Sequence, residues 1–241
     1  MQIIPVRIEK EIEPCDDISK LIIDSVEIHD GDILVIAQKI ISKQEGRIVE
    51  LSSVVPSLLA EGISSQYEKN PRIIELILKE SKQIIRMQHG IIIVETNNGF
   101  ICANAGIDES NVKNGFVTLL PLDSDASAYK IRKEIMEKIN KTVSVVISDT
   151  FGRPFRMGQT NHAIGISGMN PILDYAGTKD SFEKTLRITA IAIADELCSA
   201  AELVMKKATN CPVAIIRGYD FKNEDSGIFD LIRPQNEDLF R

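Results

Sequence analysis

The sequence predicts an α+β fold, in which mixed sheets pack against helices, and two observations support this. Short apolar runs typical of buried strands occur along the whole chain, with helical patterns between them. These segments do not follow the regular strand–helix–strand alternation of a doubly wound sheet. The 241 residues contain no internal repeat and no linker rich in Pro, Gly or Ser. We therefore expect a single unit over residues 1–241, with a division into two lobes left open.

Four helices are predicted from capping residues that precede an apolar stripe at helical spacing. The capping signals are Asp16 or Asp17, Asn70 with Pro71, Asp125, and Asp180 with Glu183. The helix after Asp125 should extend to about Asn140. The last signal resembles a capping box, and the stripe that follows it reaches Val204, so the longest helix is expected there.

Buried strands are predicted where short apolar runs are bounded by turn signals. These runs cover residues 33–37, 91–94, 100–103, 143–147 and 213–216. Asn97-Asn98-Gly99 predicts a hairpin turn between the second and third of them. The polar tail after Asp220 is expected to add at best an ordered edge.

Charge and hydropathy exclude several classes of protein. The net charge of −7 argues against a general nucleic-acid binder, which needs a basic face, but allows a local basic pocket. No apolar run approaches the roughly 20 residues that span a bilayer. The N-terminus lacks the pattern of a signal peptide, so we expect a cytoplasmic protein with no membrane partner. The four cysteines form no C-x-x-C pair and are expected to be reduced thiols.

A polar stretch with metal- and anion-binding potential follows the apolar run 143–147. It contains Asp149, Thr150, Arg153 and Arg156. A carboxylate and a hydroxyl can ligate a metal ion, and arginines can clamp phosphate or carboxylate groups. The alternative is a strand end with an Asp cap and two solvated arginines, and for this stretch alone the alternative is favoured. His162, farther along, is expected to have a structural role.

A basic segment follows the predicted strand 33–37. If the chain is helical from Gln38, then Lys39 and Lys43 share one face, which could extend to Arg47. Cations at a helix start suit a polyphosphate. A solvated basic face is an equally good interpretation.

A third segment, residues 104–111, follows the strand predicted at 100–103. Asp108 is a candidate metal ligand and Asn111 a candidate phosphate or base contact. The alternative is a turn that caps the next segment. Glu109 is expected to be exposed, as are the helix carboxylates Asp195 and Glu196.

The three segments together contain what phosphoryl transfer requires, namely oxygen ligands for metal ions and fixed cations. The sequence has no Walker motif and no dinucleotide fingerprint. The residues alone predict a metal-dependent enzyme that acts on phosphorylated compounds. A phosphohydrolase or kinase, and a non-catalytic nucleotide-binding subunit, stay open as alternatives.

Six blocks, in collinear order from about Pro5 to Gly218, resemble the coenzyme F-420-0:L-glutamate ligase (coenzyme F-420 γ-glutamyl ligase) family. They are DGDILVIAQKIISKQEGR, ESKQIIRMQHGIIIVETNNGFICANAGIDESNV, LLPLDSDASA, VISDTFGRPFRMGQTNHAIGISG, TAIAIADELCSAAELVM and PVAIIRG. The resemblance implies a two-lobed α+β monomer in an intertwined homodimer. It also implies a stand-alone catalytic unit without the nitroreductase-like domain that some relatives carry.

The resemblance implies a GTP-dependent ligase that adds L-glutamate to the deazaflavin coenzyme F-420-0, and then a second, γ-linked glutamate. GDP and phosphate are released, and an acyl phosphate is the expected intermediate. The implied cofactors are Mg²⁺ or Mn²⁺, two per site, with K⁺ as a further activator.

Site residues also follow from the resemblance. Asp108 and Asp149 are implied as metal ligands, with Thr150 on a second metal ion. Arg153 and Arg156 are assigned to acceptor anions from their position after the catalytic Asp149, and not from the resemblance. The implied nucleotide contacts are Glu9, Lys10, Glu11, Ile12, Gln38, Lys39, Lys43, Asn111, Met205, Lys206, Lys207 and Ala208.

The chain departs from the family at two of these places. Around Glu9 to Ile12 it lacks the usual Gly-, Leu- and Pro-containing sequence. After Met205, many relatives continue with Gly, whereas this chain continues with Lys206 and Lys207. That loop aligns with a nucleotide and metal contact, and a lysine is a poor metal ligand.

Overall fold

The computed structural model describes residues 1–221, 224 and 226–239. Its largest sheet has the strand order β1-β12-β2-β8-β9. The strands are β1 (Gln2–Val6), β12 (Val213–Arg217), β2 (Ile33–Ala37), β8 (Ser144–Arg153) and β9 (Arg156–Ser167). The β2–β8 pair is parallel and the other pairs are antiparallel. The sheet is therefore mixed, and the prediction of an α+β fold is confirmed.

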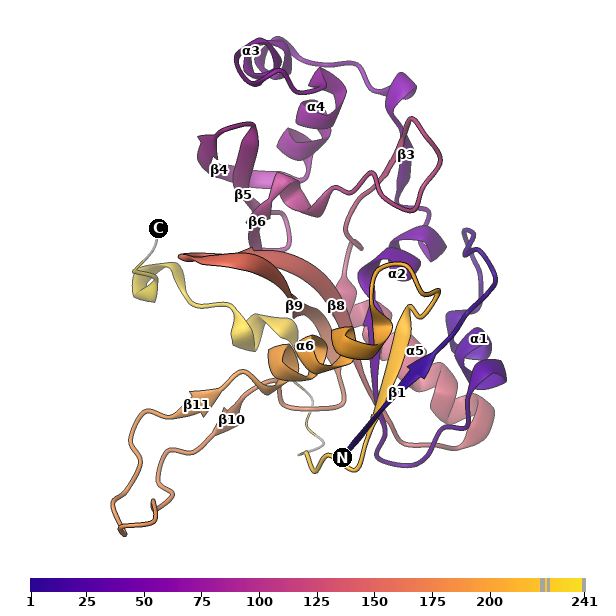
Figure 1. The fold of residues 1–241 in the computed structure, drawn as a ribbon, viewed down its shortest axis with the longest axis vertical. Helices are drawn as coiled ribbons and strands as arrows, with labels where there is room; N and C mark the ends of the chain where they lie inside the picture. Colours follow the sequence, from indigo (N-terminus) through magenta and orange to yellow (C-terminus); the bar gives the residue numbers. More distant parts are fainter. Residues whose placement is uncertain (222–223, 225, 240–241) are drawn as a thin grey trace.

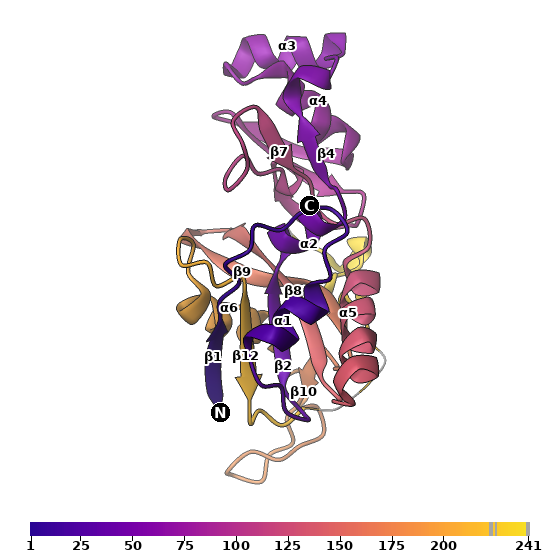
Figure 2. The ribbon, with the colours of Figure 1, turned by 90° about the vertical axis from the view of Figure 1, so that its right-hand side faces the viewer.

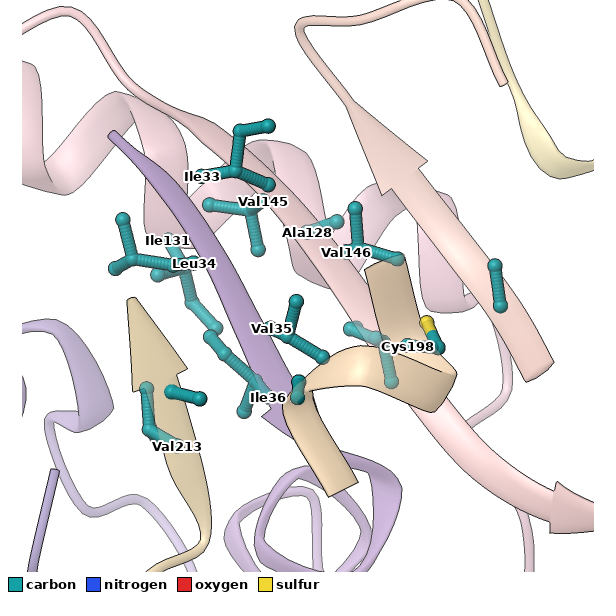
Figure 3. Packing of buried hydrophobic residues seen from close by; sticks show 14 of the residues in the cluster. Ile33, Leu34, Val35, Ile36, Ala128, Ile131, Val145, Val146, Cys198 and Val213 are labelled. Carbon is teal, nitrogen blue, oxygen red and sulfur yellow. The ribbon is translucent and has the colours of Figure 1, made fainter. Parts of the chain in front are cut away.

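Helices cover both faces of this sheet, as Figure 2 shows. One face carries α6 (Ile193–Met205), and the other carries α5 (Ser124–Ile139) with α1 (Ile18–Ser25) packed beside it. The strands between them are buried on both sides: Ile33, Leu34, Val35 and Ile36 are each 0% exposed. Cys198 of α6 and Ile131 of α5 pack onto opposite faces of these strands (Figure 3). This large lobe holds the main hydrophobic core.

A second hydrophobic cluster forms in residues 48–119, which we call the small lobe (Figure 1). It is inserted between β2 and β8 and joined to β2 through α2 (Gln38–Gln44). Its elements are β3 (Ile48–Glu50), α3 (Leu58–Tyr67), α4 (Pro71–Lys79), β4 (Ser81–Gln88), β5 (Ile91–Thr96), β6 (Ile101–Ala103) and β7 (Phe116–Thr118). β4, β5 and β6 form one sheet, and β3 pairs with β7.

Short 3-10 turns complete the described chain. They cover Leu51–Ser53, Asn104–Gly106, Ile228–Leu231 and Gln235–Glu237. The tail after Asp220 was expected to form at best an ordered edge, but part of it packs against the large lobe. Ile228 is 4% exposed, and its N–H donates to the Asp125 carboxylate at 2.9 Å. None of the helices in the described ranges has the length and apolarity needed to cross a membrane.

Two predicted helix starts and the hairpin turn are confirmed. The Asp17 carboxylate caps α1 by accepting the Lys20 N–H, and the Asn70 side chain caps α4 with Pro71 in the first turn. Asn97-Asn98-Gly99 joins β5 to β6. These signals succeed because capping and tight turns depend on neighbouring residues alone.

The predicted cap of α5 is wrong by two residues. Asp123 caps the helix by accepting the Ala126 N–H at 2.9 Å. Asp125 lies in the first turn, where its carboxylate accepts the N–H groups of Ile166 and Ile228 instead. The carboxylate of Asp125, which the local pattern assigned to the helix cap, thus makes tertiary hydrogen bonds instead.

The predicted helix start at Asp180 is also wrong. The carboxylate of Asp180 accepts the N–H groups of Phe182 and Lys184 in a turn, and α6 begins only at Ile193. Residues 173–191 form an extended arm with two short strands, β10 (Leu173–Asp174) and β11 (Ala190–Ile191), that leaves the body of the molecule (Figure 1). An apolar stripe does not fold into a helix without a core to cover. The longest described helix is therefore α5, with 16 residues.

Candidate active site

The candidate site lies where β8 leaves the buried part of the sheet. Sequence reasoning ended this strand near Ile147, but β8 continues to Arg153. Its outer half pairs with β9 in a hairpin, with Asp149 opposite His162 and Thr150 opposite Asn161. The polar residues therefore lie on a two-stranded ribbon that extends beyond the core. The pairing of the strands orients their side chains more firmly than a loop would.

Parallel pairing of β2 with β8 brings the first two predicted segments together. Ala37, the last residue of β2, is the partner of Ser148. The helix α2 starts immediately afterwards at Gln38, which meets the condition for Lys39 and Lys43 to share one face. Adjacent carboxyl ends of parallel strands create a site for ligands, and here they place Lys39 close to Asp149.

Asp108 comes from the small lobe and joins this site through Lys39. The Lys39 Nζ lies 2.6 Å from Asp108 Oδ2 and also 2.6 Å from Ser110 Oγ. Burial raises the pKa of Asp108, but the hydrogen bonds from Lys39 and the Ser110 N–H outweigh it, so the pKa lies below its ordinary value. Asp108 is therefore ionised at neutral pH.

Asp149 is the most perturbed carboxylate of the site. Its pKa is raised to about 6, mainly by burial and also by the nearby negative charge of Asp108, while the Thr150 N–H and the positive charges of Lys207 and Lys39 lower it. The three predicted segments thus meet within electrostatic range. Asp108 and Asp149 repel each other in a partly desolvated place. A cation bound between them would offset this repulsion.

Thr150 belongs to a polar cluster that sequence reasoning missed. Its hydroxyl donates to the Asn161 side-chain oxygen at 2.7 Å, and the Asn161 amide donates to Glu202 Oε2 at 3.0 Å. Asn161 is 4% exposed. A signal existed for Glu202, because it lies seven residues after Asp195 and therefore on the same face of α6.

Asp195 and His162 make contacts that link α6 to the β8–β9 hairpin. Contrary to the expectation of an exposed carboxylate, Asp195 accepts the Ala163 N–H at 2.8 Å and lies 3.3 Å from His162 Nδ1. The imidazole also stacks on Phe151, with the ring centroids 5.8 Å apart. These contacts fit the structural role expected for His162. Glu196 and Glu109 are exposed, as predicted.

Lys43 joins the site to the N-terminal segment. Its side chain is 8% exposed and pairs with Glu11. Of the neighbours of Glu11, Ile12 is buried in the core and Lys10 pairs with Asp16, while Glu9 is exposed. The segment 9–12 therefore lies beside α2.

Arg47 does not share the face of the two lysines, because α2 ends at Gln44. Its guanidinium donates to Glu80 at 2.7 Å and to the Leu120 carbonyl at 2.9 Å. The Gln38 amide nitrogen also has a hydrogen-bond partner, because it donates to Ser42 Oγ at 2.6 Å.

The remaining predicted contacts are placed as follows. Asn111 is exposed in the loop after Asp108. The Met205 side chain is 2% exposed in the main core. Lys206, Lys207 and Ala208 are exposed in the loop after α6. Of these, Lys207 reaches the site, with its Nζ 2.6 Å from the Thr150 hydroxyl.

The donor set suits a hard divalent cation. Asp108 and Asp149 supply carboxylate oxygens and Thr150 a hydroxyl oxygen, and such oxygens are the ligands that Mg²⁺ and Mn²⁺ prefer. The described residues form no cluster of three or more His, Cys, Asp or Glu side chains. A cation here would thus need phosphate or water oxygens to complete its coordination, as is usual for Mg²⁺.

The chain is similar to one family of ligases. The sequence profile of the family described as F420-0:Gamma-glutamyl ligase matches residues 6–218. The protein named coenzyme F420:L-glutamate ligase of Methanothermobacter thermautotrophicus is 46% identical over 94% of this chain and 93% of its own length. The protein of the same name from Methanopyrus kandleri is 40% identical over 100% of this chain and 98% of its own length.

Proposed function

Because the chain belongs to the F420-0:Gamma-glutamyl ligase family, we propose that it joins L-glutamate to coenzyme F-420-0 in the biosynthesis of coenzyme F-420. The observation that carries the proposal is the meeting of Asp149, Asp108 and Lys39 at the carboxyl ends of β2 and β8. A fixed cation, together with a metal ion held by the carboxylates, would offset the repulsion between two anionic reactants.

The proposed energy source is GTP. A carboxylate does not form an amide with an amine until one oxygen becomes a leaving group. In the proposed reaction the γ-phosphoryl group moves to the acceptor carboxylate and GDP leaves. The glutamate amine then forms the C–N bond, and phosphate departs.

Each residue of the site has a role in this scheme. Lys39 and Lys43 would exchange their present carboxylate partners for phosphate oxygens. Asp108 and Asp149 would hold Mg²⁺ or Mn²⁺, which when bound supplies positive charge between the triphosphate and the acceptor carboxylate. The buried surroundings of Asp149 strengthen these attractions.

The assay that tests the proposal uses the purified protein with coenzyme F-420-0, L-glutamate, Mn²⁺, K⁺ and either GTP or ATP. Mass spectrometry should show products heavier by one and then two glutamate residues, with GTP preferred. Phosphate release without glutamate addition would favour a phosphohydrolase or kinase instead. Nucleotide binding without turnover would favour a non-catalytic subunit.

We propose that Arg153 and Arg156 bind the acceptor rather than the metal-bound phosphates. They pair at the tip of the β8–β9 hairpin, four residues beyond Asp149, which is roughly 13 Å along a strand. Arg156 is exposed, and the buried Arg153 Nε lacks a hydrogen-bond partner among the described residues. The exposed guanidinium of Arg156 thus has donors available for an anion, whereas Arg153 already donates to the Met157 carbonyl at 2.8 Å.

Replacing Arg156 by Gln should raise KM for coenzyme F-420-0 about tenfold, equivalent to about 1.4 kcal/mol, because one charge-assisted contact is lost. The KM for GTP should stay unchanged. Initial-rate kinetics with each substrate varied in turn measure both values. Arg86→Gln, at an exposed arginine of β4, is the matched control. An equal rise in both KM values would contradict the assignment.

We also propose that the arm, residues 173–191, contributes to a homodimer. Phe182 is 82% exposed and Ile188 92% exposed. Only two residue pairs join β10 to β11, and a two-stranded ribbon of this kind is marginally stable alone. Exposed apolar side chains on such an arm are typical of a protein interface.

The double variant Phe182→Ser/Ile188→Ser should convert the dimer to a monomer, because it removes the apolar contacts of the arm. Light scattering coupled to size-exclusion chromatography measures the mass. Lys184→Ser, on the same arm, should leave the dimer intact. A monomeric wild-type protein, or a double variant that stays dimeric, would refute the proposal.

A further inference from the structure

Four side chains beside Asp149 form a closed ring of polar contacts. The Thr150 hydroxyl donates to Asn161 at 2.7 Å, and the Asn161 amide donates to Glu202 at 3.0 Å. Lys207 closes the ring, with its Nζ 3.2 Å from Glu202 Oε1 and 2.6 Å from the Thr150 hydroxyl. The ring combines residues from β8, β9, α6 and the loop after α6.

The fold fixes the members of this ring. Thr150 and Asn161 are directly opposite each other in the β8–β9 pair. Glu202 lies in the last turns of α6, which is capped by Lys206 in a left-handed backbone conformation (φ 54°). This turn redirects the chain, and Lys207, the next residue, reaches back over the end of the helix to the ring.

The ammonium of Lys207 behaves as a bound cation. It has three N–H donors, and it meets the oxygens of Thr150 and Glu202, with the Asn161 side-chain oxygen at 3.5 Å. A divalent cation on Thr150 would compete for these same oxygens. It would also lie within a few ångströms of a positive charge, and like charges so close repel strongly.

We propose that the Lys207 ammonium takes the place of a second divalent cation at Thr150, so that each chain binds one Mg²⁺ or Mn²⁺, at Asp108 and Asp149. This inference rests on the proposed function, because it concerns the same site. It replaces the count of two metal ions that the family resemblance implies. Lys207 thus supplies permanently one of the charges that the triphosphate needs.

The experiment counts Mn²⁺ bound to the purified protein, with Mn²⁺ alone as the probe, by equilibrium dialysis and electron paramagnetic resonance. We expect one Mn²⁺ per wild-type chain and two per Lys207→Gln chain, because the glutamine amide offers an oxygen and no charge. Lys207→Arg keeps the charge and should keep the count at one. Lys133→Gln, at an exposed lysine of α5, should also bind one.

A wild-type count of two or none, or a Lys207→Gln count that stays at one, would overturn the inference. The Lys207 side chain is 63% exposed, so the variant is expected to fold, and its thermal unfolding curve checks this. The readout is independent of turnover. A chain that binds one Mn²⁺ as described but adds no glutamate would refute the proposed function and leave the inference standing.

Discussion

Replacing Asp149 by Asn is expected to reduce glutamate addition by about 10³-fold or more, while the protein stays folded. The amide removes a negative charge from the place where a cation must be held between two anions, and losses of this size follow when a site loses a principal electrostatic element. The side chains have nearly the same shape, so packing is preserved. Turnover of the variant is measured with the assay described above. Activity near that of the wild type would exclude Asp149 from the metal site.

The same variant should be more stable than the wild type at pH 7 without metal. Burial raises the pKa of Asp149 from 3.8 to about 6 in the folded protein. The stability that this group contributes is present at pH values below 3.8 and is lost as the pH rises through about 6. The loss is about 3 kcal/mol, and the amide, which does not ionise, avoids it.

Thermal unfolding at pH 4 and pH 7 tests this prediction. The difference in Tm between Asp149→Asn and the wild type should grow from pH 4 to pH 7. Added Mn²⁺ should raise the Tm of the wild type and leave that of the variant unchanged. Asp24→Asn, at a carboxylate that is 61% exposed on α1, is the matched control and should follow the wild type in both respects. A variant that follows the wild type at both pH values would contradict the prediction.

Replacing Gly165 by Ala should destabilise the large lobe by about 3 kcal/mol or more. A Cβ atom at Gly165 would lie 2.5 Å from the backbone carbon and oxygen of Ser124. Backbone cannot rotate away, so the first turn of α5 must shift. That shift also strains the hydrogen bonds that the Asp125 carboxylate accepts from the N–H groups of Ile166 and Ile228, which link α5 to β9 and to the tail.

Urea denaturation followed by circular dichroism measures the free energy of unfolding of this variant. Gly152→Ala is the matched control, since Gly152 lies in the same β8–β9 hairpin and a Cβ atom added there would meet nothing within 4 Å. It should change stability by less than about 1 kcal/mol. Insoluble Gly165→Ala beside soluble Gly152→Ala would agree with the prediction, whereas two equally stable variants would contradict it.

The sequence predicts the parts of the fold that depend on local chemistry. The Asp17 and Asn70 caps and the Asn97-Asn98-Gly99 turn are confirmed because their partners lie a few residues away. The assignment of Asp180 as a helix cap fails because the arm has no core of its own chain to cover. The true end of β8 was missed because pairing with β9, and not hydrophobicity, extends that strand.

The sequence also predicted part of the candidate site. Asp149, Asp108 and Lys39 were recognisable as chemical groups placed just after strands, and the structure brings them together. Asn161 and Glu202 were missed, because an amide in a strand and a carboxylate on a helix resemble solvated residues until the tertiary fold pairs them. Their place beside Thr150 depends on contacts between residues about 40 positions apart in the chain.

The order of strands in the main sheet has a consequence for how the chain folds during synthesis. β1 and β2 are made early, yet both pair with β12, whose first residue is Val213. The hydrophobic cluster of the small lobe lies between residues 51 and 119, so it can form long before β12 leaves the ribosome. At 5–20 residues per second, β2 waits roughly 10 s or more for β12. The edge of Ile33–Ala37 that pairs with β12 stays unpaired during this interval, and an unpaired apolar strand edge favours aggregation.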